Sequence, residues 1–160
     1  MSTRQPVTAA IRVLREQGVA FTEHPYEYEE RGGTAVSAHK LGVPEHACIK
    51  TLVMEDDRKR PLVVLMHGDR EVSTKNLARF LDVKSVAPCT PAVADRHSGY
   101  QVGGTSPFGM RKRMPVYLQR TIADLPYLYV NGGRRGYLVG MTPAELMRVL
   151  QPVVVDVATT

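Results

Sequence analysis

The residues best suited to chemistry lie in a glycine-rich stretch, GYQVGGTSPFGMRKRMPVY, at 99–117. Gly103 and Gly104 lack Cβ atoms, so backbone N–H groups around them can converge on negative charge. Thr105 and Ser106 add hydroxyl donors. Such a loop can form an oxyanion hole at a carbonyl or a docking point for a phosphate. An ordinary turn between strands, followed by a solvated basic tail, has the same composition, so both interpretations stay open.

Three familiar motifs do not match this stretch. It lacks the G-x-x-x-x-G-K-[ST] pattern of a P-loop, whose lysine and hydroxyl reach the outer phosphates and the metal. Its glycines do not have the G-x-G-x-x-G spacing of a dinucleotide-binding turn. It also lacks the G-x-S-x-G elbow of the α/β-hydrolases. A nucleotide-binding enzyme of the familiar types is therefore disfavoured.

Lys50 is the second unusual residue, because it interrupts the apolar segment CIKTLVM. The alternation of a strand places its side chain on one face with Cys48, Leu52 and Met54. A lysine on such a face either extends into solvent at the end of the strand or meets an anion in a pocket. Thr51 faces the opposite way and is a common strand residue as well as a candidate ligand.

A second glycine pair occurs in YVNGGRRG, at 129–136, where Asn-Gly and Gly-Gly predict a tight hairpin turn. Basic residues follow both glycine pairs, and a third basic group, RKR at 58–60, lies at another predicted turn. Clustered cations can form one phosphate-binding surface if the fold brings the loops together. The cations beside the two glycine pairs are Arg111, Lys112, Arg113, Arg134 and Arg135.

Composition limits the class of protein. The 160 residues fit one domain, 1–160, and the excess of 21 Lys and Arg over 16 Asp and Glu favours an anionic partner such as nucleic acid. Two cysteines without C-x-x-C spacing indicate a reduced, cytoplasmic protein. No segment has the apolar length of a membrane span. The five histidines share no metal-ligand spacing, so we expect neither a metal nor another cofactor.

The elements that would position these residues follow from hydrophobic periodicity and capping signals. Helices are expected over 6–17, 34–41, 73–82 and 90–97, and from Thr142, where TPAE has the form of a capping box. Strands are expected within 19–26, over 47–55 and 61–68 as a hairpin, and within 114–119, 126–130 and 136–140. Because strands and helices do not alternate strictly, the order predicts an α+β domain with a mixed sheet.

The joint order of IKTLVM, GYQVGGTSPFG with its basic run, and YVNGGRRG resembles the YbaK/EbsC family of free-standing aminoacyl-tRNA deacylases. These are related to the editing insertion of bacterial prolyl-tRNA synthetases. The resemblance implies an α+β fold on a mixed, barrel-like sheet with surrounding helices. It also implies a cofactor-independent hydrolase that removes a mischarged amino acid from the 3′ end of tRNA, most characteristically from Cys-tRNA(Pro).

The resemblance also assigns residues. The family's lysine falls on Lys50 and its early-strand tyrosine on Tyr26, while Asn131 and Leu138 replace a serine and an aspartate typical of cysteine-specific members. The cysteine preference is therefore open, and alanine is another candidate side chain. The two family loops fall on Gly103, Gly104, Thr105, Ser106 and Pro107, and on Gly132 and Gly133.

An aminoacyl ester is already reactive, so positioning and oxyanion stabilisation are sufficient catalysis. We expect Lys50 to hold the terminal phosphate or the ester region and the N–H groups of 103–106 to meet the oxyanion. Water or a group of the substrate would attack. The basic loops would bind the acceptor end of tRNA, with prolyl-tRNA synthetase as a second partner. The alternative is a module that binds a tRNA end or a synthetase without catalysis.

Overall fold

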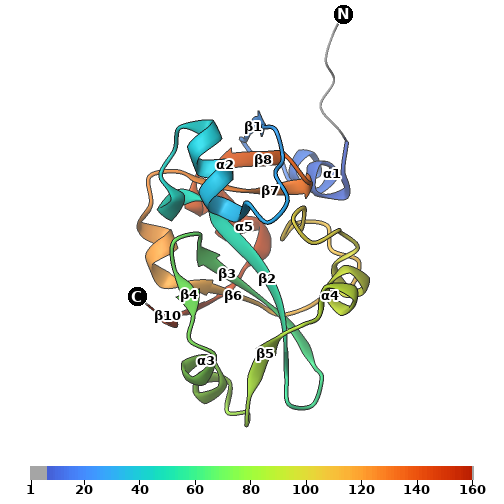
Figure 1. The fold of residues 1–160 in the computed structure, drawn as a ribbon, viewed down its shortest axis with the longest axis vertical. Coiled ribbons are helices and arrows are strands. Elements are labelled where there is room, and N and C mark those ends of the chain that lie inside the picture. Colours follow the sequence, from blue (N-terminus) through green and yellow to red (C-terminus); the bar gives the residue numbers. More distant parts are fainter. Residues whose placement is uncertain (1–6, 160) are drawn as a thin grey trace, which may run out of the picture.

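The computed structural model describes residues 7–159 as an α+β fold in which helices surround three β-sheets (Figure 1). Its helices are α1 (Ala9–Glu16), α2 (Gly33–Leu41), α3 (Thr74–Leu81), α4 (Pro91–Ser98) and α5 (Pro143–Leu150), with short 3-10 turns η1 (Glu45–Ala47) and η2 (Arg120–Asp124). None of the helices described here is both long and apolar enough to cross a membrane.

The largest sheet has the strand order β5-β2-β3-β6-β9, with β2–β3 and β2–β5 antiparallel and β3–β6 and β6–β9 parallel. Its strands are β2 (Ile49–Asp56), β3 (Pro61–His67), β5 (Val86–Pro88), β6 (Val116–Gln119) and β9 (Val153–Val155). The second sheet is β1 (Thr22–Pro25), β8 (Tyr137–Met141) and β7 (Leu128–Arg134), and the third pairs β4 (Glu71–Val72) with β10 (Ala158–Thr159). The predicted α+β class is confirmed, but within residues 7–159 the strands form separate sheets and not a closed barrel.

The β2–β3 hairpin separates two apolar clusters, as the alternation of its side chains predicts. Ile49, Val53 and Leu65 face a cluster that α1, β7, β8 and α5 cover. Met54 and Met66 face a smaller cluster that α3 covers. Lys50 lies opposite Met66 in the register and therefore belongs to this second face, as expected from the sequence.

Side chains at helix starts explain why these segments fold locally. Ser73 Oγ accepts a hydrogen bond from Asn76 N, and Thr90 Oγ1 accepts one from Val93 N, so both side chains cap the helices that follow them. Only half of the predicted capping box at α5 is present. Thr142 Oγ1 accepts from Glu145 N, while the Glu145 carboxylate binds Arg148 instead.

The YVNGGRRG segment departs from the tight turn that its glycines predict. Asn131–Gly133 lies within β7, and the register between β7 and β8 shifts between Asn131 and Arg134. The chain reverses after Arg134, at Arg135 and Gly136. A β-bulge therefore takes the place of the Asn-Gly turn. As a result, Arg135 lies against the 99–117 loop.

Candidate active site in a cavity along strand β2

A cavity of about 700 Å³ runs along β2, in the region where that strand lacks a neighbour between β7 and β5. Strand β2 supplies one wall, and α2 with the segment before it supplies another. The predicted site residues that line this cavity come from four separate parts of the chain. They are Tyr26, Lys50, Thr51, Gly103, Thr105, Asn131 and Arg135.

The glycine-rich loop has free backbone donors at the cavity. Gly104 N donates to Gln101 O at 2.8 Å, which closes a turn. The N–H groups of Gly103, Thr105 and Ser106 have no acceptor among residues 7–159. Two of these three residues, Gly103 and Thr105, also line the cavity. The arrangement suits a group that develops negative charge.

Asn131 joins the two glycine loops. Its Nδ2 donates to Gly103 O at 3.3 Å, and its Oδ1 accepts from Gly133 N at 2.7 Å and Arg134 N at 3.0 Å. A Cβ on Gly104 would lie 2.7 Å from Arg135 N, so only glycine permits this approach of the two backbones. The bulge in β7 is thus the support on which the 99–117 loop lies.

Arg135 fixes the rim of the cavity. Its Nε donates to Val102 O at 2.9 Å, and its guanidinium carbon lies 5.1 Å from the centre of the Tyr28 ring. Asp95 of α4 holds the same loop from the other side, where its Oδ1 accepts from Val102 N at 3.0 Å. Neither Asp95 nor Tyr28 belongs to a motif, so sequence reasoning gave neither residue a role in the site.

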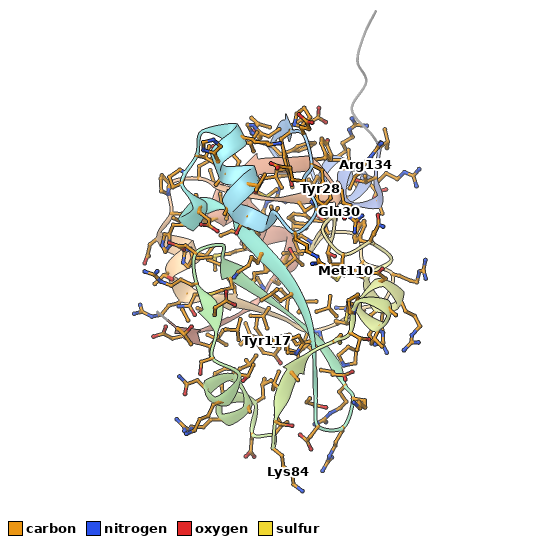
Figure 2. All side chains as sticks on the ribbon, in the orientation of Figure 1. Tyr28, Glu30, Lys84, Met110, Tyr117 and Arg134 are labelled. Carbon is orange, nitrogen blue, oxygen red and sulfur yellow. The ribbon has the colours of Figure 1, made fainter. Side chains whose placement is uncertain are left out.

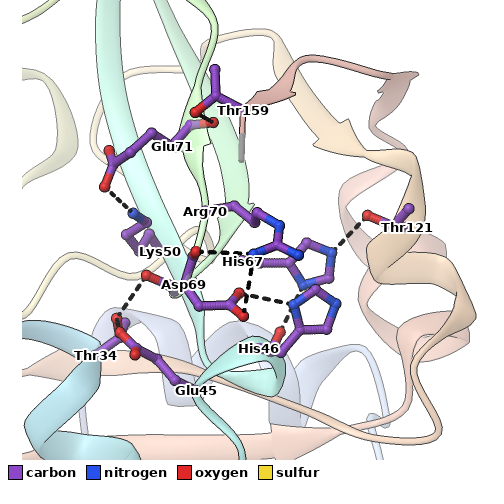
Figure 3. Close-up of polar contacts among 11 residues, drawn as sticks. Thr34, Glu45, His46, Lys50, His67, Asp69, Arg70, Glu71, Thr121 and Thr159 are labelled. Carbon is purple, nitrogen blue, oxygen red and sulfur yellow. Dashed lines mark hydrogen bonds and ion pairs between the residues drawn. The ribbon is translucent and has the colours of Figure 1, made fainter.

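Lys50 reaches toward Glu71 of β4, and the two side chains form an ion pair with Nζ and Oε1 at 3.3 Å (Figure 3). The Lys50 side chain is 19% exposed and that of Glu71 is 80% exposed. The Lys50 ammonium group therefore has a largely solvated counter-ion. An anionic ligand can compete for it.

Thr51 and Tyr26 are two further polar residues that line the cavity. Thr51 Oγ1 is buried and has no hydrogen-bond partner in the described part of the chain. Such a hydroxyl is uncommon in folded proteins. Burial raises the pKa of Tyr26, and the neighbouring Tyr28 adds to this effect, so its phenol stays protonated at neutral pH. Tyr26 can donate a hydrogen bond to a ligand.

Other predicted site residues serve the scaffold in this structure and do not line the cavity. Ser106 is fully buried, and its Oγ accepts from Phe108 N at 3.2 Å. Thr8 Oγ1 donates to Gly132 O, which ties the second loop to the start of α1. A Cβ on Gly133 would lie 2.9 Å from Tyr100. Of the predicted catalytic and substrate-binding residues, those outside the cavity lining are Gly104, Ser106, Pro107, Gly132 and Gly133.

The cations divide between two regions. Arg111, Lys112, Arg113 and Arg134 are exposed and do not line the cavity, and Arg134 lies close to Tyr28 and Glu30 in projection (Figure 2). The 58–60 group lies at the tip of the β2–β3 hairpin, toward the opposite end, and its members Lys59 and Arg60 pair with acidic residues of their own hairpin. The fold thus does not make one surface of all three basic groups.

The fold also brings together three possible metal ligands, His46, His67 and Asp69, whose ligand atoms lie within 4.8 Å of one another (Figure 3). The two imidazole rings stack at 3.7 Å. His67 uses both ring nitrogens, with Nδ1 at 2.7 Å from His46 O and Nε2 at 2.7 Å from Thr121 Oγ1. Burial lowers the pKa of His67, so its neutral form bridges η1 and η2. These bonds explain the cluster without a metal.

Several known proteins are similar to this chain in sequence or in fold. The family model described as aminoacyl-tRNA editing domain matches residues 29–149. EbsC of Enterococcus faecalis, provisionally named a Cys-tRNA(Pro)/Cys-tRNA(Cys) deacylase, is 29% identical over 144 residues, which are 89% of this chain and 88% of that protein.

Two further comparisons extend the match. Proline–tRNA ligase of Streptococcus thermophilus is 27% identical over 139 residues, which are 85% of this chain but 21% of the ligase. A crystal structure described as that of a candidate trans-editing enzyme for prolyl-tRNA synthetase has a TM-score of 0.82 at 22% identity, covering 98% of this chain and 100% of that one. The chain belongs to the aminoacyl-tRNA editing domain family.

Proposed function

We propose that this protein is a hydrolase that removes a mischarged amino acid from the 3′ end of tRNA in trans, as one editing domain over residues 1–160. The observation that supports this most directly is the shared cavity of Lys50, Gly103 and Thr105. Lys50 of β2 and two residues of the glycine loop with unpaired amides line the same cavity. The family of the chain and the names of its relatives give the chemical class of the substrate.

The reaction needs little from the protein beyond placement. Water attacks the carbonyl carbon of the aminoacyl ester, the carbon–oxygen bond to the terminal ribose breaks, and the ribose oxygen takes up a proton. The products are a free amino acid and uncharged tRNA. The unpaired N–H groups of Gly103 and Thr105 stabilise the oxyanion, and one such donor contributes about 100-fold or more to the rate. Histidine is absent from the described residues that line the cavity.

Lys50 binds the phosphate of the terminal nucleotide or the ester region. When substrate enters, its negative charge replaces Glu71 as the partner of the ammonium group. Glu71 is mostly solvated, so this exchange loses little interaction energy. The Lys50 ammonium group thereby has an anionic partner both with and without bound substrate.

The amino acid is small. Leu138 and Asn131 are direct neighbours in the β7–β8 register, and both line the cavity, where Leu138 presents an apolar surface. Cysteine attached to tRNA(Pro) and alanine are the two candidates. If the substrate is a cysteinyl ester, its own thiol is an alternative nucleophile to water.

The acceptor end of tRNA binds along the exposed cations that follow the two glycine-rich loops. These are Arg111, Lys112, Arg113 and Arg134. Arg135, which is held by Val102, supports the same surface from the rim. Association with prolyl-tRNA synthetase would deliver newly mischarged tRNA, and the cytoplasm is the compartment where this occurs.

A panel of mischarged tRNAs tests the proposal. Purified protein is mixed with Cys-tRNA(Pro), Ala-tRNA(Pro) and correctly charged Pro-tRNA(Pro), and loss of the ester is measured over time. Faster loss of the cysteinyl or alanyl ester supports the proposal. Binding of these tRNAs without ester loss identifies the alternative, a non-catalytic module for tRNA ends, and refutes the hydrolase.

A further inference from the structure

The hydrogen bonds of β2 to β3 show which way the even-numbered residues of β2 point. Cys48 O accepts from Gly68 N at 2.7 Å, and Asp56 N donates to Arg60 O at 3.1 Å. Both pairs have the same register as the β2–β3 ladder. In an antiparallel pair, N–H and C=O of one residue point to the same neighbour. The backbone groups of even-numbered residues are therefore used by β3.

The odd-numbered residues point to the opposite edge. Val53 O accepts from Cys89 N at 3.1 Å, just before the β2–β5 pairs begin at Met54. At its other end, β2 touches β7 through the single bridge between Cys48 and Tyr129. Between these contacts lies Thr51, and within residues 7–159 no strand pairs with its free edge. Its N–H and C=O therefore point toward the open side of the strand.

This open edge belongs to the cavity. Thr51 lines it, together with Ile49 on one side and Val53 on the other. The Thr51 hydroxyl also lacks a hydrogen-bond partner among the described residues. It lies beside a backbone N–H and C=O that no described strand pairs with. Unpaired backbone groups at a strand edge are a template for another extended backbone. Here the unpaired part of the β2 edge is short, so it can pair with a single residue of a ligand.

We propose that the aminoacyl group of the substrate pairs with Thr51 as one residue of an antiparallel strand. This inference depends on the proposed function and names how the ester is recognised. The α-ammonium group donates to Thr51 O, and the ester carbonyl oxygen accepts from Thr51 N–H. These are the two bonds that a hydrogen-bonded pair of residues exchanges in an antiparallel sheet.

The pairing has a chemical consequence. Thr51 N–H polarises the ester carbonyl from the β2 side, while Gly103 and Thr105 N–H act from the loop. The α-ammonium group becomes a required feature of the substrate, whereas the amino-acid side chain is left to the rest of the cavity. An N-acylated residue, as at the end of a growing peptide, lacks the ammonium group and loses the charge-assisted bond.

Hydrogen exchange of individual amides tests the open edge in the free protein. We expect Thr51 N–H to exchange rapidly and Leu52 N–H, which β3 occupies, to be protected. Addition of 3′-alanylamino-3′-deoxyadenosine, an amide analogue that is not hydrolysed, should slow exchange at Thr51 about tenfold or more and leave Leu52 unchanged. Equal protection of both amides without the analogue, or no change at Thr51 with it, overturns the pairing.

Ester hydrolysis tests the ammonium group. Alanyl-tRNA and lactyl-tRNA differ only in the amino or hydroxyl group at the α-carbon, and each rate is divided by its uncatalysed rate. A charge-assisted hydrogen bond predicts an acceleration about tenfold or more larger for the alanyl ester. Equal accelerations of the two esters overturn the proposal.

The Thr51→Val variant separates main chain from side chain, because it removes the hydroxyl and keeps the shape and the backbone. It should retain the preference for alanyl over lactyl ester, and loss of that preference would assign recognition to the hydroxyl and overturn the main-chain pairing. If no ester is hydrolysed by the unaltered protein, the proposed function fails. The hydrogen-exchange measurement does not depend on hydrolysis, so it still tests whether the analogue pairs with Thr51.

Discussion

Asn131 on β7 and Gly103 in the 99–117 loop are joined by a hydrogen bond from Nδ2 to the glycine carbonyl at 3.3 Å. The same side chain accepts two backbone N–H bonds from its own bulge. One amide side chain therefore connects the two glycine-rich segments that the sequence separates by 28 positions. The position of the free amides in the cavity depends on this connection.

Asn131→Ala should lower both stability and deacylation. Loss of three hydrogen bonds, two of them accepted from backbone N–H groups, is expected to reduce the free energy of unfolding by about 1–3 kcal/mol. Deacylation should fall further than stability explains, because the 99–117 loop loses its support. Urea denaturation and single-turnover deacylation measure the two effects. Asn76→Ala, at an exposed residue of α3, is the matched control, and equal activity of both variants would contradict the role of Asn131.

Lys50→Ala should remove deacylation and leave the fold intact. The side chain forms one ion pair with a solvated carboxylate, so its loss has little effect on packing. Turnover should fall about 100-fold or more, as for the loss of one oxyanion-stabilising group. Single-turnover rates and circular dichroism check this. Lys84→Ala alters an exposed lysine far from Tyr28 and Glu30 of the cavity (Figure 2) and should be without effect. Full turnover by the Lys50 variant would exclude the lysine from the reaction.

Binding of tRNA should weaken steeply with salt, through the exposed cations that follow the glycine-rich loop. Reversing Arg111, Lys112 and Arg113 to glutamate should reduce the slope of log affinity against log salt by about 0.7–0.9 for each phosphate that these side chains neutralise. Filter binding from 50 to 200 mM salt gives the slope. Reversal of Lys75 and Arg79 on α3 is the control. Equal slopes for the two variants would place the tRNA elsewhere on the surface.

Stability should fall as the solution is acidified. Burial lowers the pKa of His67 below its unfolded value of about 6.5, so the unfolded state binds a proton more readily. The contribution of His67 is therefore fully present above pH 6.5 and is lost as the pH falls toward the folded pKa. Urea denaturation at pH 7.5 and 5.5 measures the difference.

His67→Gln should make that difference smaller. The substitution should not abolish the pH dependence of stability, because burial also lowers the pKa values of His24 and His97. His39→Gln, at an exposed position of α2, is the control and should keep the full pH dependence. An unchanged pH dependence in the His67 variant would show that His67 does not titrate differently in the two states.

Much of this protein follows from local patterns in its sequence. The caps at Ser73 and Thr90, the β2–β3 hairpin and the face occupied by Lys50 are consequences of short-range sterics and of the two-residue alternation of strands. The α+β class follows from the order of these elements. The short strands β4, β5, β9 and β10 were not predicted, because two or three residues carry too little periodicity to be distinguished from loops.

The tertiary structure decided which candidates share a site. It brought Lys50, Gly103 and Asn131 to one cavity, while it buried Ser106 in its own turn and directed Lys59 and Arg60 toward neighbouring carboxylates. Residue types and spacing name groups that can donate, accept or carry charge. Their use depends on long-range partners, such as Asn131 for Gly103, and on the missing partner of Thr51. Those contacts form only when distant segments pack together, so no local pattern records them.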